Sequence, residues 1–387
     1  MCYTCNEDYA PIVGTSIISI MQNLSSGGVH FWILCDTFSL KTKEKFNKIA
    51  NKYLCKIDCI DISNKMSVLL STALADEPGM VRKGQISYMY ARLFMGSAIS
   101  KDVDKVIYID ADTIIQCDLT ELYTTELKKN KILAAIRDVW PVNYNKVIGF
   151  DEYEVYFQSG LMLVNLYLWR QEKVELRIME YIKNLKIYPA LHDQDIINIC
   201  IKGKIQTLPV KYGMIYLLRH YSPNDIYYFS GKSVKQYYSS NEILSAKKTL
   251  NVIHYSGDYF GHPWVRPYAC SDAKIWQKYF AMSPWREYNP FYKKASGRAL
   301  WGASIPVISV TVWVTKERIT GAAYAEKLHP GKEDPVRGRV HGRWSVCRDG
   351  SGAPQAGKEA QGERQGAEEP EQSRQYAQEA AEGASEF

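Results

Sequence analysis

The first 62 residues alternate between short apolar segments and amphipathic ones. Strand-like stretches (CYTC, VHFWILCD and KIDCIDI) are separated by helical patterns over about residues 11–23 and 41–53. Strands that follow one another with a helix between them form parallel sheets with helices on both faces. The sequence therefore predicts an α/β fold with a mostly parallel central sheet.

A further helix and strand continue this pattern, and the strand ends on two acidic residues. Residues 86–99 (ISYMYARLFMGSAI) predict a helix, and residues 105–115 (KVIYIDADTII) begin as a buried strand that ends on Asp110 and Asp112. Alternate residues of a strand point to the same side, and ligands of open α/β sheets bind at the carboxyl ends of strands. We therefore expect both carboxylates to face one point.

Two converging carboxylates repel each other unless a cation lies between them. Mg²⁺ and Mn²⁺ both suit oxygen ligands and usually accompany a phosphate-bearing substrate. The alternative is an ordinary strand-to-loop transition, in which aspartates are common turn residues. A D-x-D pattern alone agrees with both interpretations, so other segments have to decide between them.

Two later segments offer further polar candidates. His254, in HYSGDYFGHPW, follows the strand-like TLNVI and could supply a nitrogen ligand that favours Mn²⁺, or it could be a packed histidine at a strand end. LHDQDIINI places Asp193, Gln194 and Asp195 at the start of an apolar helix. Acids at that position are also ordinary capping residues.

A third segment, VYFQSGLMLVNLYLWR, contains small residues between two apolar runs. Its QSG, residues 158–160, predicts a turn. A Ser-Gly pair lets a ligand approach the backbone closely, whereas the alternative is a buried strand with a bulge.

The length, the N-terminal sequence and the cysteine content indicate the cellular compartment of the protein. Its 387 residues suffice for one large domain or two ordinary ones, and no run of about 18 apolar residues predicts a membrane span. The N-terminal MCYTCNEDYA does not resemble a signal peptide. Nine scattered cysteines fit a reducing compartment, and the C-x-x-C of Cys2 and Cys5 has no second pair at zinc spacing. We therefore expect a cytoplasmic protein.

The last part of the chain differs in composition from the rest. Residues 296–387 contain no asparagine and are rich in Gly, Ala, Glu and Gln towards the end. Such a segment is too poor in apolar residues to offset its ordering entropy. We expect a disordered or non-native tail, from a frameshift or a fusion remnant, with a functional disordered tail as the alternative.

Taken in order, the segments resemble the family 8 glycosyltransferases, retaining enzymes of GT-A fold that include bacterial lipopolysaccharide galactosyl- and glucosyltransferases and glycogenin. The resemblance covers about residues 3–290 and rests on NEDYA, YARL, YIDAD, YFQSGLMLVN followed by LWR, DQDIIN and HYSG…PW. It implies a single Rossmann-like catalytic domain over residues 1–264, with a mixed, mostly parallel sheet. Residues 265–295 would form a basic and aromatic C-terminal segment.

The resemblance also implies roles for individual residues. Mn²⁺ or Mg²⁺ would be held by Asp110, Asp112 and His254 against the diphosphate of a UDP-sugar. Asp193 would bind donor sugar hydroxyls, and Gln194 would lie beneath the anomeric carbon; these two form the expected catalytic pair. The acceptor would face Asp138. The expected donor-binding residues are Thr4, Asn6, Tyr9, Arg92, Asp110, Ala111, Asp112, Gln158, Ser159, Gly257 and His262.

The implied reaction moves galactose or glucose from the UDP-sugar to a hydroxyl of a glycan or lipid-linked saccharide. The metal would stabilise the charge that develops on the leaving phosphate. Because the neutral amide of Gln194 is a poor nucleophile, we expect a front-face mechanism. A sugar nucleotidyltransferase, a binding-only module for nucleotide sugars and an inverting transferase are the alternatives.

Three positions depart from the family pattern. His262 stands where the family commonly has a phosphate-contacting lysine, a contact that Arg266 could supply instead. Gln158 replaces an asparagine expected at the donor sugar. Asn6 replaces an acid expected near the uracil, and the first strand is short enough for the true start to lie upstream.

The segment IWQKYFAMSPWREYNPFYKKASGR alternates aromatic residues with Lys and Arg. Such a segment can lie on an anionic membrane surface, so we expect peripheral contact with the inner face of the plasma membrane. The alternative is a terminal helix packed on the domain. Nucleic acid is not an expected partner, because the positive charge is spread thinly and no binding motif accompanies it.

Overall fold

The computed structural model describes residues 1–72, 81–82, 85–86, 88–185, 189–256, 262–265 and 272–287. Contacts between residues divide the chain into two units, Met1–Val336 and Arg337–Phe387, and all described residues belong to the first. The predictions on Gly257, on Arg266, on residues 288–295 and on the tail 296–387 lie outside the described residues. The proposed domain boundaries stay predictions.

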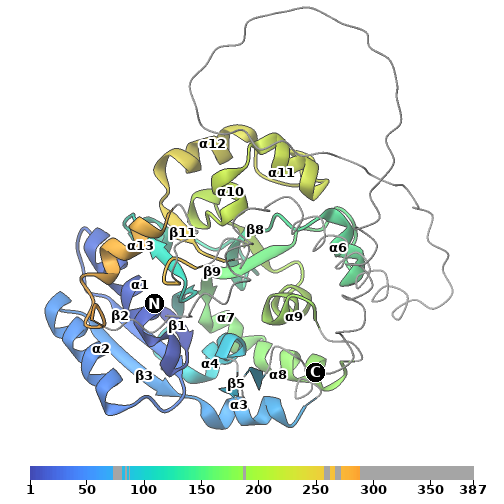
Figure 1. Ribbon diagram of the computed structural model, residues 1–387. Coiled ribbons are helices and arrows are strands. Elements are labelled where there is room, and N and C mark those ends of the chain that lie inside the picture. The colour runs from blue at the N-terminus through green and yellow to red at the C-terminus, as the bar shows by residue number, and fades with distance from the viewer. Residues whose placement is uncertain are drawn as a thin grey trace, which may run out of the picture. The chain divides into compact units, whose positions relative to one another are not determined.

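A seven-stranded sheet forms the centre of the described part. Its strands are β1 (Cys2–Cys5), β2 (His30–Cys35), β3 (Lys56–Asp61), β6 (Lys105–Ile109), β8 (Leu133–Arg137), β9 (Phe157–Asn165) and β10 (Ile205–Thr207). The order is β10-β8-β9-β6-β1-β2-β3, and β9 alone runs antiparallel to its neighbours β6 and β8 (Figure 1). The predicted mixed, mostly parallel sheet is confirmed.

The N-terminal half of the sheet follows the sequence pattern. Helices α1 (Ala10–Asn23) and α2 (Leu40–Tyr53) connect β1, β2 and β3, as predicted. Pro11 occupies the first turn of α1, where a missing N–H costs nothing. The Ser39 hydroxyl accepts a hydrogen bond from the Thr42 N–H and caps α2. Helix α1 is apolar around most of its circumference because it is buried in the core.

The predicted helix over residues 86–99 is partly wrong. Ile86 belongs to a short hairpin of β4 (Val81–Arg82) and β5 (Gln85–Ile86), in which it pairs with Val81. The backbone is therefore extended there, and a 3₁₀ helix, Tyr88–Phe94, follows, continued by α4 (Met95–Ala98).

Two local predictions about the strands also need correction. The strand that begins at Lys105 ends at Ile109, and β7 (Thr113–Ile115) leaves the main sheet to pair antiparallel with β11 (Val252–His254). The QSG segment is not a turn, because it lies inside the continuous strand β9. The irregularity at that end of β9 is a register shift opposite Ala135 and Arg137 of β8.

Helices cover both faces of the sheet, and each face has its own core. The remaining helices are α3 (Ser63–Leu70), α5 (Thr120–Thr124), α6 (Val142–Val147), α7 (Leu166–Gln171), α8 (Val174–Lys183), α9 (His192–Cys200), α10 (Tyr216–His220), α11 (Pro223–Ser230), α12 (Ser240–Thr249) and α13 (Ala273–Phe280). The core containing α1 also includes residues of α13, and the other includes residues of α8 and α9. Among the described residues, no helix has both the length and the apolarity to cross a bilayer.

The described part of the aromatic C-terminal segment packs on the domain. Trp276, Tyr279 and Trp285 are buried, and the Trp285 ring meets the ring of Phe46 from α2 edge-on at 5.1 Å between centroids. These rings are not available at a membrane surface. Membrane contact through residues 288–295, which lie outside the described residues, stays a prediction.

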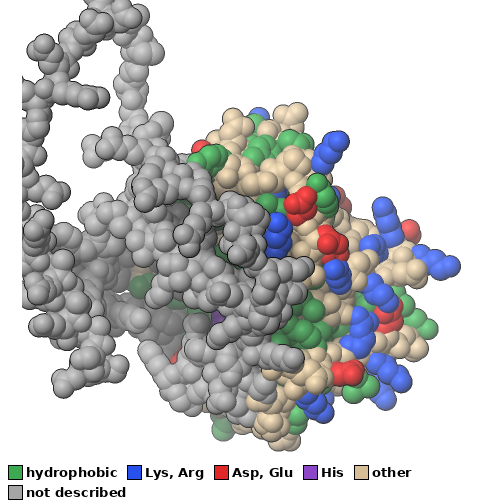
Figure 2. All heavy atoms as spheres, turned by 90° about the vertical axis from the view of Figure 1, so that its right-hand side faces the viewer, with side chains coloured by type: hydrophobic (Ala, Val, Ile, Leu, Met, Phe, Trp, Pro, Cys, Tyr) green, Lys and Arg blue, Asp and Glu red, His purple; other side chains and the backbone are tan. Residues whose placement is uncertain are grey.

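Charge is not concentrated on the face shown in Figure 2. There, Lys and Arg side chains alternate with Asp and Glu side chains and with apolar ones. The net charge of +6 therefore produces no single-sign patch on this face of the described part.

Candidate functional site

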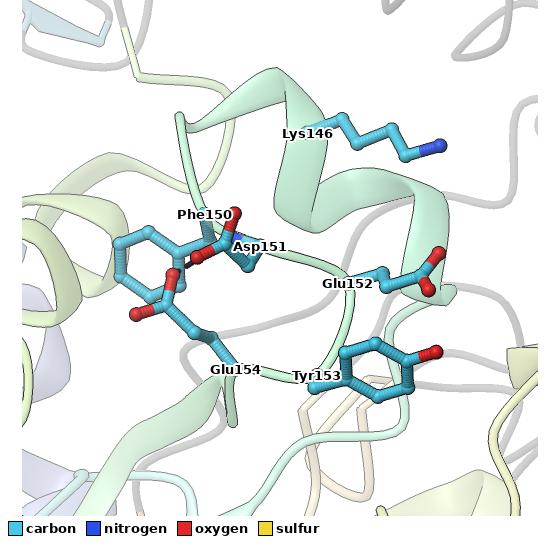
Figure 3. A pocket seen from close by; sticks show the side chains of 6 residues that line it. All are labelled: Lys146, Phe150, Asp151, Glu152, Tyr153 and Glu154. Atoms are coloured by element: carbon cyan, nitrogen blue, oxygen red, sulfur yellow. Dashed lines mark hydrogen bonds between the residues drawn. The ribbon is translucent and has the colours of Figure 1, made fainter.

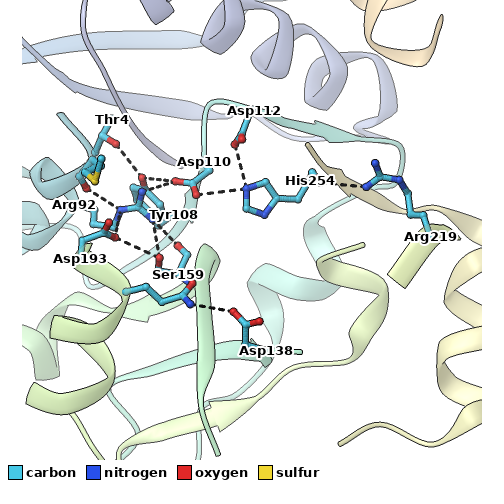
Figure 4. A network of polar contacts seen from close by, with 12 residues as sticks. Thr4, Arg92, Tyr108, Asp110, Asp112, Asp138, Ser159, Asp193, Arg219 and His254 are labelled. Carbon is cyan, nitrogen blue, oxygen red and sulfur yellow. Dashed lines mark hydrogen bonds and ion pairs between the residues drawn. The ribbon is translucent and has the colours of Figure 1, made fainter. Parts of the chain in front are cut away.

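Two carboxylates and an imidazole meet at the carboxyl end of β6. His254 Nε2 lies 3.1 Å from Asp112 Oδ1 and 3.6 Å from Asp110 Oδ2 (Figure 4). One ligand atom from each residue lies within 4.8 Å of the other two. We call these three residues the Asp–Asp–His cluster.

The cluster is assembled by a turn and not by strand alternation. Asp110 and Asp112 lie in the turn between β6 and β7, whose backbone is fixed at both ends. The Asp110 N–H donates to the Gly160 carbonyl at 2.8 Å, and the Tyr255 N–H donates to the Asp112 carbonyl at 2.9 Å. Since β7 pairs with β11, this turn places both carboxylates beside His254.

The donor set fits a divalent cation. Burial and the charge of Asp112 raise the pKa of Asp110. Burial lowers the pKa of His254, but Asp112 and Asp110 outweigh it, so that pKa ends above its ordinary value. Because the two carboxylates raise the pKa of the imidazole against the effect of burial, they favour positive charge between them. Two carboxylate oxygens and one imidazole nitrogen are ligands that suit Mn²⁺.

Gly160 of β9 lies directly against the cluster. A Cβ atom at this position would lie 2.2 Å from His254 Cε1 and 3.1 Å from Asp110 Oδ2. Only glycine lets the strand approach the imidazole this closely. The QSG segment thus makes the close approach that its small residues indicated, although its partner here is a side chain of the chain itself.

Replacing Gly160 with Ala is expected to displace His254 and raise the Mn²⁺ dissociation constant about tenfold or more. Calorimetric titration with Mn²⁺ measures this. The matched control is Gly96→Ala in α4, where a Cβ would lie 2.5 Å from Trp169 Cδ1, away from the cluster. The control should lose stability and keep its Mn²⁺ affinity; equal affinities in both variants would contradict this role of Gly160.

A buried arginine connects the cluster to helix α9. Arg92 Nη2 lies 2.7 Å from Asp110 Oδ1, and Arg92 Nε lies 2.9 Å from Asp193 Oδ2. Its Nη1 donates to the Ser159 carbonyl at 2.9 Å. Arg92 is only 5% exposed, so its charge is balanced by these two carboxylates. Asp193 therefore acts as an ion-pair partner and not as a simple helix cap.

The electrostatics of Asp193 differ from those of an exposed carboxylate. Burial raises its pKa to about 6, although the adjacent Arg92 opposes the shift. A carboxylate with such a pKa keeps its charge at neutral pH and loses it in mild acid.

The Tyr108 hydroxyl holds Asp110, and Thr4 in turn holds the Tyr108 hydroxyl. The Arg92 guanidinium lies over the Tyr108 ring, 4.6 Å from its centroid. The Tyr108 hydroxyl donates to Asp110 Oδ1 at 2.9 Å, so its contact with Thr4 Oγ1, also 2.9 Å, requires Thr4 to be the donor. Thr4 thus contacts the site through Tyr108, a residue that the sequence analysis did not select.

The Gln194 amide is held on both sides. Its Oε1 accepts from the Ser159 N–H at 3.0 Å, and its Nε2 donates to Asp138 Oδ2 at 3.0 Å and to the Tyr156 hydroxyl at 3.2 Å. These bonds fix the orientation of the amide and bring Asp138 next to Gln194. Tyr156 is a second residue that the sequence analysis missed.

Asp195, the other acid of the DQD segment, joins this network through the Tyr156 hydroxyl. Its carboxylate accepts hydrogen bonds from the Tyr156 and Tyr144 hydroxyls at 2.6 and 2.7 Å and from the Leu191 N–H at 3.0 Å. It is fully buried. This residue stabilises the start of α9, as the capping interpretation predicts.

Asp138 has a buried cation beside it. Lys232 Nζ donates to the Asp138 backbone carbonyl at 2.6 Å, and burial lowers the Lys232 pKa to about 8. Lysine is usually a surface residue, so nothing in the local sequence of Lys232 indicates this position.

Asn6, Tyr9, Ala111, Gln158 and His262 are the other described residues of the expected donor-binding set. Asn6 caps the 3₁₀ helix Glu7–Tyr9 by accepting from the Tyr9 N–H at 3.2 Å, and Tyr9 is 41% exposed. The His262 ring stacks on Trp264 at 4.6 Å between centroids. Burial raises the pKa of Asp112, but His254 and, after it, His262 bring that pKa below its ordinary value. Gln158 is buried in β9, and Ala111 lies in the turn between the two cluster carboxylates.

A separate hollow lies in the loop between α6 and β9. Its lining residues are Lys146, Phe150, Asp151, Glu152, Tyr153 and Glu154 (Figure 3). None of them belongs to the Asp–Asp–His cluster or to the Arg92 network.

Comparisons with known proteins find glycosyltransferases among the relatives of the chain. The chain is 27% identical to a putative glycosyltransferase of Haemophilus influenzae over 264 residues, 66% of this chain and 70% of the relative. It is 26% identical to a lipopolysaccharide 1,2-glucosyltransferase of Escherichia coli K12 over 295 residues, 74% of this chain and 79% of the relative.

Solved structures show the same GT-A fold. The galactosyltransferase LgtC in complex with donor and acceptor sugar analogs matches with a TM-score of 0.58 at 24% identity, covering 74% of this chain and 98% of that one. The family model described as glycosyl transferase family 8 matches residues 1–266, well over half of the chain. The chain therefore belongs to glycosyl transferase family 8.

Proposed function

We propose that the chain is a metal-dependent hexosyltransferase that moves galactose or glucose from a UDP-sugar to a hydroxyl of a saccharide or glycolipid acceptor. The observation that carries this proposal is the Asp–Asp–His cluster, linked through Arg92 to Asp193 and, by way of Ser159, to Gln194. Relatives named as lipopolysaccharide glucosyltransferases support a saccharide acceptor.

The residues divide into a metal-binding group and a sugar-binding group. Asp110, Asp112 and His254 would hold Mn²⁺ or Mg²⁺, which supplies positive charge to the departing diphosphate. Arg92 fixes Asp110 on one side and Asp193 on the other. Because one buried cation holds both carboxylates, we expect Asp193 to accept hydrogen bonds from donor sugar hydroxyls beside the metal-binding group.

The remaining donor contacts are proposed from the family to which the chain belongs. The partly exposed ring of Tyr9 would stack on uracil, with Thr4 and Asn6 near the base. Ala111, Gln158, Ser159, Gly257 and His262 complete the proposed donor-binding set. His262 would contact the diphosphate in place of the usual lysine.

Retention of anomeric configuration is proposed through front-face attack. The Gln194 carbonyl oxygen already accepts a hydrogen bond from the Ser159 N–H, and a neutral amide is a poor nucleophile. Asp138, bonded to the same amide, would face the acceptor. The leaving phosphate then takes the proton of the acceptor hydroxyl as that oxygen attacks.

Replacing Gln194 with Ala should lower kcat about 10- to 100-fold without abolishing transfer, because the amide orients Asp138 and the sugar but forms no covalent bond. Steady-state kinetics with the identified donor measures this, and UDP affinity serves as the control. Complete loss of transfer with unchanged UDP affinity would favour a covalent role for Gln194 instead.

Ligand titration separates this proposal from its rivals. Calorimetry with UDP-sugars and with nucleoside triphosphates, each with Mn²⁺, should show binding of a UDP-sugar. Triphosphate binding and consumption would indicate a nucleotidyltransferase, and UDP-sugar binding without UDP release in the presence of acceptor a binding-only module. NMR of the product's anomeric proton distinguishes retention from inversion.

We also propose a cellular setting. A cytoplasmic location and peripheral contact with the inner face of the plasma membrane would suit a glycolipid acceptor. Flotation of the protein with anionic vesicles, compared with neutral ones, tests the membrane contact.

A further inference from the structure

A second buried arginine lies directly behind the Asp–Asp–His cluster. Arg219, on α10, donates through Nη1 to the backbone carbonyl of His254 at 3.1 Å and also to that of Met214 (Figure 4). Its Nε lies 2.7 Å from Asp272 Oδ2, and its side chain is only 3% exposed. One guanidinium group therefore joins a cluster residue to a carboxylate at the start of α13.

The two carbonyls belong to neighbouring chain segments. Met214 bridges to β11 in parallel fashion: its N–H donates to Val252 at 3.0 Å, and its carbonyl accepts from the His254 N–H at 3.3 Å. The main-chain hydrogen bonding of β11 on this side ends at His254. Arg219 closes that end by binding the last carbonyl of each segment.

Tyr255 makes a second connection between the end of β11 and the start of α13, besides that of Arg219. The Tyr255 hydroxyl donates to the Asp272 carbonyl at 2.9 Å, and the Arg219 guanidinium lies 5.5 Å from the centroid of the Tyr255 ring. Residues 254 and 255 are thus held by the side chain of Arg219 and by the beginning of α13 together. This is the point at which the chain leaves β11.

Arg219 does not belong to the donor set of the cluster. It contacts the backbone of His254, on the side away from the carboxylates, so its effect on a bound ion must pass through the position of the imidazole (Figure 4). Residues that orient a metal ligand in this way commonly change metal affinity 10- to 100-fold when they are replaced.

We propose that Arg219 is a positioning residue that sets the metal affinity of the Asp–Asp–His cluster by clamping the backbone of His254 to Asp272 of α13. The proposal rests on the proposed function in one respect, namely that the cluster binds a divalent ion. It adds that the C-terminal helix α13 is energetically coupled to the metal site.

The test is the Mn²⁺ dissociation constant of the full-length protein without donor, measured from the electron paramagnetic resonance signal of free Mn²⁺. Arg219→Met should raise this constant about tenfold or more. Arg219→Lys keeps the charge but cannot bind two carbonyls and Asp272 together. Its Mn²⁺ dissociation constant should therefore lie between those of wild type and Arg219→Met. Asp272→Asn, which leaves Arg219 in place, should raise the constant less than Arg219→Met.

Arg170 provides a matched control. This arginine of α7 also binds backbone carbonyls, those of Gly96 and Val103 at 2.8 Å and of Ile99 at 3.1 Å, but contacts no residue of the cluster. Arg170→Met should lower the unfolding temperature while leaving the Mn²⁺ dissociation constant of the folded protein unchanged. A merely structural role of Arg219 would make the two variants behave alike.

The outcomes are distinct. If wild type binds Mn²⁺, and both Arg219→Met and Asp272→Asn have the same Mn²⁺ dissociation constant as wild type, the positioning role is wrong and the proposed function stands. If wild type itself does not bind Mn²⁺, the proposed metal site is wrong and the inference falls with it. Should Arg219→Met fail to fold, Asp272→Asn and Arg219→Lys decide by the same measurement.

Discussion

Replacing Asp112 with Asn is expected to abolish measurable Mn²⁺ binding and to lower the rate of sugar transfer about 1,000-fold or more. A metal ion contributes several kcal/mol of charge stabilisation at the transition state, and each 1.36 kcal/mol corresponds to a factor of ten in rate. Asp112 is the carboxylate closest to His254, at 3.1 Å. The amide keeps the shape of the side chain and removes the charge, so the loss should fall on metal binding and not on folding.

Thermal unfolding with and without Mn²⁺ measures this independently of activity. A ligand that binds only the folded state raises the unfolding temperature, so Mn²⁺ should stabilise wild type and leave Asp112→Asn unchanged. Asp118→Asn is the control, because Asp118 accepts backbone hydrogen bonds from Ser25 and Thr120 and lies outside the cluster. An Asp112→Asn protein that Mn²⁺ stabilises as strongly as wild type would contradict the assigned metal site.

Replacing Arg92 with Met should cost both stability and activity. The substitution leaves Asp110 and Asp193 without their shared cation, and removing one partner of a buried ion pair typically costs about 3–5 kcal/mol. Asp193 is 5% exposed, so water cannot replace the guanidinium. The free energy of unfolding from urea titration measures the loss, and UDP release measures the accompanying fall in activity.

Arg92→Lys separates charge from geometry. A lysine ammonium can pair with one carboxylate but cannot span Asp110, Asp193 and the Ser159 carbonyl as the guanidinium does. It should therefore recover part of the stability and little of the activity. If the free energy of unfolding of Arg92→Met lies within about 1 kcal/mol of the wild-type value, the network does not supply the ion-pair energy assigned to it.

The N-terminal half of the fold could be predicted because its signals are local. Apolar runs such as that of β2 and the helical spacing of Phe46 and Ile49 in α2 specify strand and helix within a few residues. The turn at Asp110 and Asp112 was harder, because β7 diverges to pair with β11, which lies far along the chain. Sequence periodicity contains no information about such a distant partner.

The site residues likewise divide into those that the sequence could identify and those that only the packed structure shows. The resemblance to family 8 identified Asp110, Asp112, His254, Asp193 and Gln194, and the structure places them in one connected network. The resemblance also selected Arg92 and Ser159, but it did not identify Tyr108, Tyr156 or Arg219, which help to hold the site residues in place. Burial of a charged side chain is a tertiary property, so the role of Arg219 is visible only once α10, β11 and α13 are packed together.

The most direct test of the central claim is UDP release by the full-length protein from a panel of UDP-sugars. The protein would first be stripped of metal with EDTA and then assayed before and after Mn²⁺ is restored. We expect release from one hexose donor only when Mn²⁺ is present, with release faster once a saccharide acceptor is added. Release that is equally fast without metal, or the absence of both UDP binding and release with Mn²⁺, would contradict the account.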